Sequence, residues 1–221
     1  TIWVRSDNDN DGTEGCYGLT SFDITVYDNP VPTATDLADC EIGATGAADF
    51  NLDATVVADG GTVSFYLSEA DANVPQNALT GTDAYNTGST TIWVRSDNDN
   101  DGTEGCYGLT SFTVTVYDNP TCIASNSASG DPDTVDPEIM RECTTNAVNL
   151  SVTPTPADEG QYTYKWSSTT GMAYLSADDI ANPVFNGLGD APEGVYTFSV
   201  LVTNTITNCT TSCETTFKMY N

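Results

Sequence analysis

Apolar and polar residues alternate along most of this chain with a period of two, which is typical of strands with one buried face. In the middle of the chain, the alternating apolar positions predict four strands. These positions are Phe50, Leu52, Ala54 and Val56, then Val63, Phe65 and Leu67, then Ile92 and Val94, then Phe112, Val114 and Val116. Residues 68–79 interrupt the alternation, and we expect one helical turn there.

The last hundred residues show the same alternation with different residues. The inward positions are Val148, Leu150 and Val152, then Tyr162, Tyr164 and Trp166, then Tyr196, Phe198, Val200 and Val202, then Phe217 and Met219. Turns rich in Gly, Pro, Asn and Asp separate these segments. The pattern predicts an all-β protein, built of tandem Ig-like β-sandwich domains in an extended array.

An internal repeat sets the domain boundaries. Residues 1–30 and 91–120 match except where Asp23 and Ile24 become Thr113 and Val114. The offset of 90 residues is the size of a sandwich domain. We therefore expect the C-terminal part of a truncated repeat at 1–30, a complete Ig-like repeat at 31–120 and a further Ig-like domain at 121–221. The predicted inter-domain residues precede the two boundary prolines, and they are Asp28, Asn29, Asp118 and Asn119.

Seven cysteines suggest a framework of disulfides. They are Cys16, Cys40, Cys106, Cys122, Cys143, Cys209 and Cys213. Cys40 and Cys106 are 66 residues apart, as are Cys143 and Cys209. We expect a Cys40–Cys106 bond that closes the middle domain. In the last domain Cys143 pairs with Cys209 or Cys213, and Cys122 takes the other.

The odd cysteine is Cys16, the counterpart of Cys106. Its partner is expected before residue 1, in the missing part of the first repeat. A zinc site is the competing interpretation, but the sequence has no histidine and no CxxC pair. Disulfides indicate an extracellular or cell-surface location.

The net charge of −27 narrows the possible partners. Such a surface repels nucleic acids and anionic lipid headgroups, and it attracts divalent cations. There is no apolar run that predicts membrane insertion in this segment. Histidine is absent, and no arrangement of nucleophile and base is visible, so we expect no enzyme.

Two copies of one acidic loop are candidate metal sites. The sequence SDNDNDGTEGC occurs at 6–16 and again at 96–106. Its alternating carboxylates are suitable ligands for Ca²⁺, and its Gly allows a tight turn. The candidate ligands are Asp7, Asp9, Asp11 and Glu14 in the first copy, and Asp97, Asp99, Asp101 and Glu104 in the second. The alternative is a solvated hairpin turn.

The loop is not an EF-hand. Position 12 of the second copy falls on Gly108 in place of the bidentate Glu of an EF-hand, and strands flank the loop. Backbone carbonyls or groups from a neighbouring domain would complete the ligand shell. We expect the loop to face the linker from the preceding domain, near Asp28 and Asn29.

A second candidate surface is the outward face of two strands, which carries Trp93, Arg95, Thr113, Thr115 and Tyr117. Aromatic side chains on such a face can stack on surface glycans. More often they cover neighbouring side chains, and Arg95 beside Trp93 could form a cation–π pair.

Two groups of motifs support a family resemblance. The segments VSFYLSEADA, TIWVR and SFTVTV, within residues 31–120, resemble the tandem Ig-like repeats of large Bacteroidota surface proteins, notably the flavobacterial gliding-motility adhesins. The segments YTYKWSS and GVYTFSVLVTNTITNC resemble a PKD-like Ig module. The resemblance implies export by type IX secretion, surface attachment, and a role in adhesion to other cells or in gliding.

These observations together predict a structural segment of a bacterial cell-surface adhesin or fibre. Its disulfide-bonded Ig-like domains contact neighbouring repeats of the same chain, and calcium stiffens the array. One alternative is a spacer or carbohydrate-binding module of a secreted enzyme. The other is a subunit of a self-assembling extracellular filament.

Overall fold

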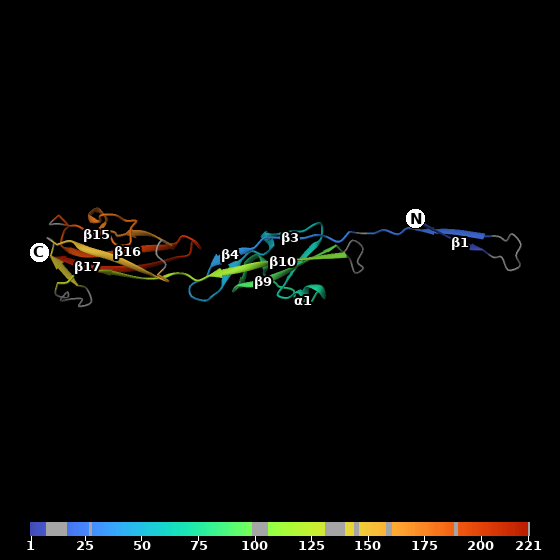
Figure 1. Cartoon of the computed structure of the whole chain (residues 1–221), viewed down its shortest axis with the longest axis horizontal. Helices are drawn as coiled ribbons and strands as arrows, with labels where there is room; N and C mark the ends of the chain where they lie inside the picture. The colour runs from blue at the N-terminus through green and yellow to red at the C-terminus, as the bar shows by residue number, and fades with distance from the viewer. Residues whose placement is uncertain are drawn as a thin grey trace. The chain divides into compact units, whose positions relative to one another are not determined.

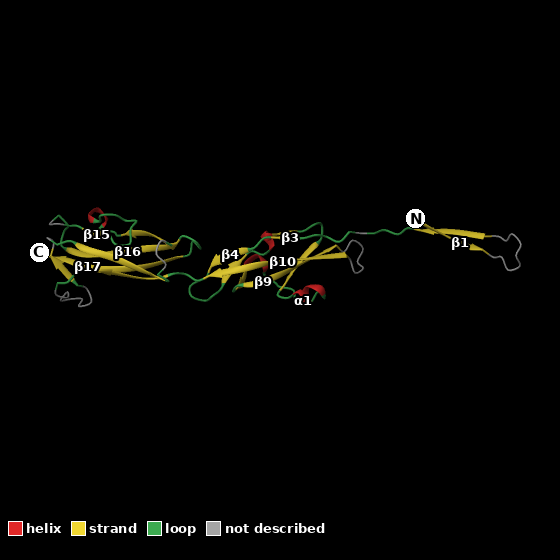
Figure 2. Ribbon diagram, in the orientation of Figure 1, coloured by secondary structure: helices red, strands yellow, loops and turns green. Residues whose placement is uncertain are grey.

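The computed structural model describes residues 1–7, 17–26, 28–98, 106–130, 140–143, 146–157, 161–187 and 190–220. Strands dominate these ranges (yellow in Figure 2), and the helical segments are short. The helical segments are α1 (Glu69–Asn73) and the 3₁₀ turns η1 (Asp53–Thr55), η2 (Thr82–Ala84) and η3 (Met172–Tyr174). None of the helices in the described ranges is long and apolar enough to cross a lipid bilayer.

The described residues fall into two compact units. The first contains residues 1–34, 56–79 and 92–111, and the second contains residues 35–55, 80–91 and 112–221. The domain boundaries expected after residues 30 and 120 stay predictions.

Antiparallel strand pairs make up much of the first unit. Strand β1 (Ile2–Asp7) pairs with β2 (Tyr17–Phe22), near the N-terminus in Figure 1. The short β3 (Thr33–Ala34) pairs with β6 (Val56–Val57). Strand β7 (Thr62–Tyr66) pairs with β9 (Thr90–Asn98), and α1 directly follows β7.

In the second unit, β4 (Leu37–Cys40) runs parallel to the end of β10 (Cys106–Tyr117), and β5 (Ala48–Phe50) pairs antiparallel with β8 (Tyr85–Thr87). Strands β4 and β10 belong to a four-stranded sheet of order β4-β10-β9-β7, which also contains the β7–β9 pair described above. In the β4–β10 register, Cys40 lies opposite Tyr117, so this cysteine sits where the last strand of the repeat ends.

Residues 121–220 form a β-sandwich of two sheets. One sheet has the order β11-β13-β15, from β11 (Thr121–Asn126), β13 (Val148–Thr155) and β15 (Val184–Phe185). The other has the order β12-β17-β16-β14, from β12 (Arg141–Cys143), β17 (Thr210–Tyr220), β16 (Gly194–Asn204) and β14 (Tyr162–Ser167). Strand β12 runs parallel to β17, as β4 runs parallel to β10.

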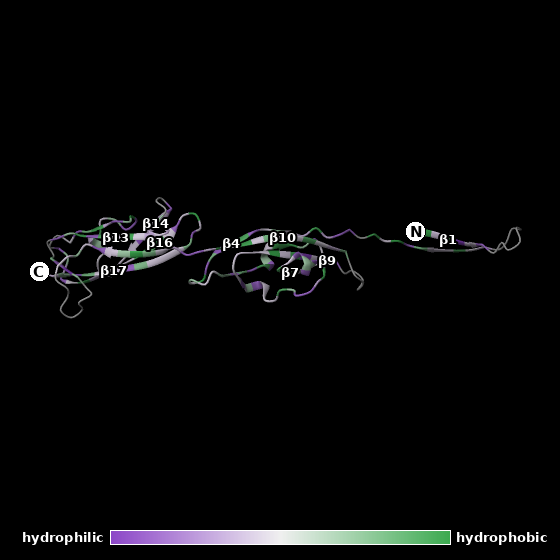
Figure 3. Ribbon diagram, turned by 60° about the horizontal axis from the view of Figure 1, so that its bottom comes forward, coloured by the Kyte–Doolittle hydropathy of each residue, from purple (hydrophilic) through white to green (hydrophobic). Residues whose placement is uncertain are grey.

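The core of this sandwich is built around Phe185, which is fully buried. Its ring centroid lies 4.9 Å from that of Tyr196, 5.2 Å from that of Phe217 and 5.8 Å from that of Phe198. These aromatic side chains come from both sheets, so Phe185 joins the two layers. Apolar stretches of β13 and β16 are green in Figure 3.

Most inward positions expected from the alternation are buried. All four predicted strands of the last domain are present, and their inward side chains are buried except for Tyr164, which is half-buried. In the middle of the chain, Ala54 and Leu67 are exposed, so these two predictions are wrong. The turn η1 rotates Ala54 out of the alternation, and β7 ends at Tyr66, one residue before Leu67. The helical turn expected in 68–79 is confirmed as α1.

The chain therefore has the predicted all-β fold of tandem β-sandwich domains. Its longest strands have 11 or 12 residues, the helical segments in the described ranges are short, and a buried apolar cluster fills the sandwich of residues 121–220.

Replacing Phe185 by Ala should destabilise the last domain by about 3–5 kcal/mol, because a cavity opens between its two sheets. Urea denaturation followed by the fluorescence of the buried Trp166 measures the change. The control is Val195→Ala on β16, where the side chain is half-exposed and the loss should be small. Equal losses in the two variants would contradict this account of the core.

Candidate functional site

A disulfide between Cys40 and Cys209 joins the two predicted domains on either side of residue 120. The cysteines are 169 residues apart in sequence, and their Cα atoms are 5.5 Å apart, a normal distance for this bond. Cys40 is the last residue of β4, and Cys209 immediately precedes β17. The chain is thus connected twice across residues 118–120, once by the peptide backbone and once through sulfur.

The short hairpin between β16 and β17 holds Cys209 in place. Asn204 Oδ1 accepts hydrogen bonds from the backbone N–H groups of Ile206 (2.9 Å) and Thr207 (3.3 Å). The N–H of Asn204 donates to the carbonyl of Cys209 at 2.9 Å, and Asn208 takes a left-handed conformation with φ of 62°. As a result Cys209 is almost completely buried.

Hydrogen bonds also fix the segment that follows Cys40. The backbone N–H of Asn119 donates to Glu41 Oε1 at 3.1 Å. Its side-chain amide donates to the carbonyls of Glu41 (2.8 Å) and Gly43 (3.0 Å). Through these hydrogen bonds, Asn119 holds the start of the predicted linker against residues 41–43, which directly follow Cys40. Asp118, in contrast, is exposed to solvent.

The second disulfide joins Cys122 on β11 to Cys213 on β17, with Cα atoms 6.0 Å apart. These strands belong to different sheets of the last sandwich. The bond therefore holds the two layers together, and it uses one of the two partners that the sequence left open for Cys122.

Two expected pairings are wrong. Cys40 bonds to Cys209 and not to Cys106, and neither Cys209 nor Cys213 is left to bond Cys143. In the last domain the reason is geometric. Cys143 lies opposite Tyr220 in the β12–β17 register, whereas Cys209 precedes the other end of β17. Eleven residues of extended strand span about 37 Å, far beyond the Cα separation of about 7 Å that a disulfide tolerates.

The equal spacing of 66 residues therefore marks equivalent positions in two domains, and not bonded pairs. Cys40 and Cys143 are 103 positions apart, as are Cys106 and Cys209, and Tyr117 and Tyr220. An offset common to the three pairs could have revealed the correspondence from sequence. The bond itself then joins the earlier cysteine of one domain to the later cysteine of the next.

Of the predicted calcium ligands, only Asp7 and Asp97 lie within the described ranges. The others, Asp9, Asp11, Glu14, Asp99, Asp101 and Glu104, lie outside them, as does Cys16. Asp97 Oδ2 accepts from Arg95 Nε and pairs with Arg95 Nη2, both at 2.7 Å. Asp97 Oδ1 is buried and has no hydrogen-bond partner among the described residues.

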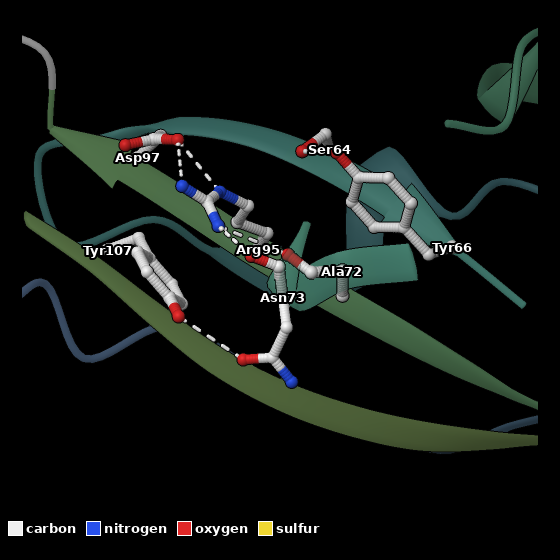
Figure 4. A network of polar contacts seen from close by, with 7 residues as sticks. All are labelled: Ser64, Tyr66, Ala72, Asn73, Arg95, Asp97 and Tyr107. Carbon is white, nitrogen blue, oxygen red and sulfur yellow. Dashed lines mark hydrogen bonds and ion pairs between the residues drawn. The ribbon is translucent and has the colours of Figure 1, made fainter. Parts of the chain in front are cut away.

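Arg95 connects Asp97 on β9 to helix α1 (Figure 4). Its Nη1 donates to the carbonyls of Ala72 (3.1 Å) and Asn73 (3.3 Å), at the C-terminal end of α1. Its guanidinium group lies over the ring of Tyr107, 3.7 Å from the centroid, and the Tyr107 hydroxyl donates to Asn73 Oδ1 at 3.2 Å. The expectation of an outward-facing Arg95 paired with Trp93 is wrong. Its cation–π partner is Tyr107, and only 7% of Arg95 is exposed.

The β1–β2 hairpin repeats part of this arrangement. Arg5 forms an ion pair with Asp7 at 2.6 Å and lies over the Tyr17 ring, 4.3 Å from its centroid. The Arg5 side chain is nevertheless 58% exposed, against 8% for the Arg95 side chain. Among the described residues, the β1–β2 hairpin thus contains the Arg–Asp–Tyr cluster without any helix beside it. In the second copy, Arg95 also bonds to α1, and there the arginine side chain is buried.

The linker before the middle repeat passes beside the start of β10. A Cβ atom at Gly108 would overlap the carbonyl oxygen of Pro30, so this glycine allows the backbones to approach closely. Asp28 and Asn29 are exposed next to this contact. The expectation that the acidic loop faces the preceding linker stays a prediction, because residues 99–105 lie outside the described ranges.

Comparison with known proteins gives one family match. Residues 36–120 match the model of the Flavobacterium inter-domain disulphide bond domain. No curated protein matches the chain.

Similar solved structures include Sidekick-1 immunoglobulin domains 1–5, titin domains A168–A170 and Drosophila N-cadherin EC1–3. Their sequence identities are 9%, 12% and 11%, and their TM-scores are 0.39, 0.37 and 0.31. The matches cover 99%, 99% and 87% of this chain, and 46%, 74% and 68% of the other chains. The chain thus spans less than half of the Sidekick-1 structure.

The family match agrees with the observed bond. Cys40 lies inside the matched range 36–120, and Cys209 lies outside it. Two disulfides are typical of proteins in an oxidising, extracytoplasmic environment. Residues 36–120 are therefore similar to a flavobacterial domain family, and a disulfide joins Cys40 inside this range to Cys209 beyond it.

Replacing Arg95 by Met should destabilise the middle domain by about 2–4 kcal/mol, because it leaves a carboxylate and two helix carbonyls without their donor. Arg5→Met, at the same position of the repeat, is a matched control and should leave the unfolding midpoint unchanged, because Arg5 is exposed. Thermal unfolding by circular dichroism measures both variants. Similar shifts in the two would show that the bonds to α1 contribute nothing.

Proposed function

We propose that this chain is a structural segment of a flavobacterial cell-surface protein, in which a disulfide fixes each Ig-like domain to the next. The Cys40–Cys209 bond is the observation that carries this proposal. A spacer built only on peptide linkers would not need a cysteine at the end of β4 and another in the hairpin of the next domain.

A second covalent connection stiffens a domain junction. A peptide linker alone lets two domains rotate about several backbone dihedral angles. In this chain, Cys40 is bonded to the next domain, and Asn119 holds the linker to the residues that follow Cys40. Hinge rotation at the junction would then break hydrogen bonds or strain the disulfide, so the segment acts as a stiff spacer.

The finer role is inferred from the resemblance of the repeats to gliding-motility adhesins. We propose export by type IX secretion and a place in the stalk of an adhesin, where the domains carry a binding tip away from the cell. The net charge of −27 supports a solvated surface between cells, because it opposes aggregation of neighbouring stalks.

We also propose that Ca²⁺ binds the acidic hairpins at 6–16 and 96–106. Four carboxylates within eight residues repel one another unless a cation neutralises them. The buried Asp97 Oδ1, which has no partner among the described residues, supports the proposal, because a buried carboxylate oxygen is costly without a ligand. The position of the preceding linker beside Gly108 would let such an ion stiffen that junction as well.

The inter-domain bond predicts a specific gel pattern. A protease site is inserted between Pro120 and Thr121 in the full chain, and the protein is cut under native conditions. A denaturing gel without reductant should show one band, because Cys40–Cys209 joins the fragments, and reductant should release two. Cys209→Ser is the control and should give two bands in both gels. If the cut protein with all its cysteines gave two bands without reductant, the proposal would be overturned.

Stiffness is measured on the same protein without the protease site. Small-angle scattering should give a narrower distribution of interatomic distances for the full chain than for a Cys40→Ser/Cys209→Ser variant. The variant Cys122→Ser/Cys213→Ser is the matched control, since it removes a bond within one domain. Identical distributions for the full chain and the first variant would show that the bond does not limit hinge motion.

Calcium binding predicts a shift in thermal stability. With calcium at a hundredfold excess over its Kd, one site adds roughly 2.7 kcal/mol, which raises the melting temperature by several degrees relative to EGTA. The substitution Asp97→Asn/Asp99→Asn/Asp101→Asn should abolish the shift from the second loop. No calcium-dependent shift in the unsubstituted chain would identify the loops as ordinary charged turns.

A further inference from the structure

Cys143 is a half-exposed thiol at the end of β12 and belongs to neither disulfide. Its position corresponds to that of Cys40. Each cysteine ends a short strand that runs parallel to the last strand of its domain, and each lies opposite a tyrosine, Tyr117 for Cys40 and Tyr220 for Cys143. The equivalence is therefore one of strand register, and it does not depend on sequence similarity between the domains.

The backbone around the two cysteines is held in the same way. The N–H of Cys40 donates to Asp39 Oδ1 at 2.7 Å, and the N–H of Cys143 donates to Glu142 Oε1 at 3.0 Å. The amide of Asn146 donates to Glu142 Oε1 at 2.7 Å, and this bond is the main reason why the pKa of Glu142 lies below its usual value. In both domains an acidic side chain thus fixes the cysteine at the end of its strand.

The disulfide of Cys40 shows which kind of partner a cysteine at this position bonds to. Cys40 is bonded to a cysteine in the last hairpin of the domain that follows it. Within residues 121–220, Cys143 has no comparable partner, because Cys209 is already bonded to Cys40 and Cys213 to Cys122. The same position therefore has a known type of partner in one domain and a half-exposed thiol in the other.

We propose that Cys143 forms a second inter-domain disulfide, with a cysteine in the last β-hairpin of an Ig-like domain that follows residues 121–220. The partner cysteine would correspond to Cys209. This inference rests on the proposed function, since it extends the Cys40–Cys209 bond to the next junction. It assigns residues 121–220, which lie beyond the matched family range, the same connecting role as residues 36–120.

The bond forms by two exchange steps with a low-molecular-weight disulfide as oxidant. The Cys143 thiolate attacks one sulfur of the oxidant, and the other sulfur leaves as a thiolate. The partner cysteine, as its thiolate, then attacks the Cys143 sulfur of the mixed disulfide and displaces the second oxidant thiolate. Both cysteines lose their protons, and the oxidant is reduced to two thiols.

The test adds one domain to the full chain. Residue 220 is followed by Asp-Asn-Pro, as Tyr117 is in the native chain, and then by a second copy of residues 121–220. The protein is refolded with oxidised and reduced glutathione, its remaining thiols are alkylated, and its disulfides are mapped by mass spectrometry. We expect Cys143 of the first copy to be bonded to Cys209 of the second, with the original Cys40–Cys209 bond intact.

The outcomes separate the inference from the proposed function. An alkylated Cys143 beside an intact Cys40–Cys209 bond would overturn the inference alone. Loss of the Cys40–Cys209 bond as well would overturn the proposed function. A bond from Cys143 to Cys106 or Cys16 would also overturn the inference. The control Cys143→Ser in the first copy should leave Cys209 of the second copy open to alkylation and the Cys40–Cys209 bond unchanged.

Discussion

The parallel pairing of a short strand with the end of the last strand determines where the covalent chemistry of this chain takes place. Strands β4 and β12 each end beside the tyrosine that terminates β10 or β17. A cysteine at the end of such a strand is separated by the whole length of the last strand from the hairpin cysteine of its own domain. A disulfide needs Cα atoms within about 7 Å, so these two cysteines cannot bond to each other. Cys40 bonds instead to Cys209, beyond its own predicted domain.

The second constraint is the low number of cations. The chain has 32 acidic residues and five basic ones, so each Arg has many possible partners and its placement matters. Arg95 joins a carboxylate, a tyrosine ring and two helix carbonyls in one buried cluster. Its planar group with several donors is suited to this task, whereas the single ammonium group of Lys is not. The end of β9 and helix α1 are therefore stabilised through one side chain.

Much of the fold was predictable from the sequence, because the inward side chains of each strand alternate regularly. The exceptions are local. A 3₁₀ turn moved Ala54 outward, and β7 ended one residue before Leu67. The burial of Arg95 was not predictable, because Arg95 lies on the polar face of its strand and is buried only where it bonds to α1.

The cysteine pairing was missed for a different reason. Spacing identifies equivalent positions, but only the strand register shows that the two cysteines of a domain are far apart. A pairing between domains has no local signal in the sequence, since its two halves are 169 residues apart. The inter-domain role expected of Asn119 stays a prediction, and its hydrogen bonds to Glu41 and Gly43 depend on the folded loop.

The Cys40–Cys209 bond also defines the path that tension would take through the chain. A pulling force applied at the two ends passes from residue 40 to residue 209 through sulfur, and the polypeptide between them bears no load. Fully extended, those residues would add roughly 60 nm, at about 3.5 Å per residue. A surface filament with this bond would keep its length under shear even where a sandwich inside the loop unfolds, and it would lengthen abruptly on reduction.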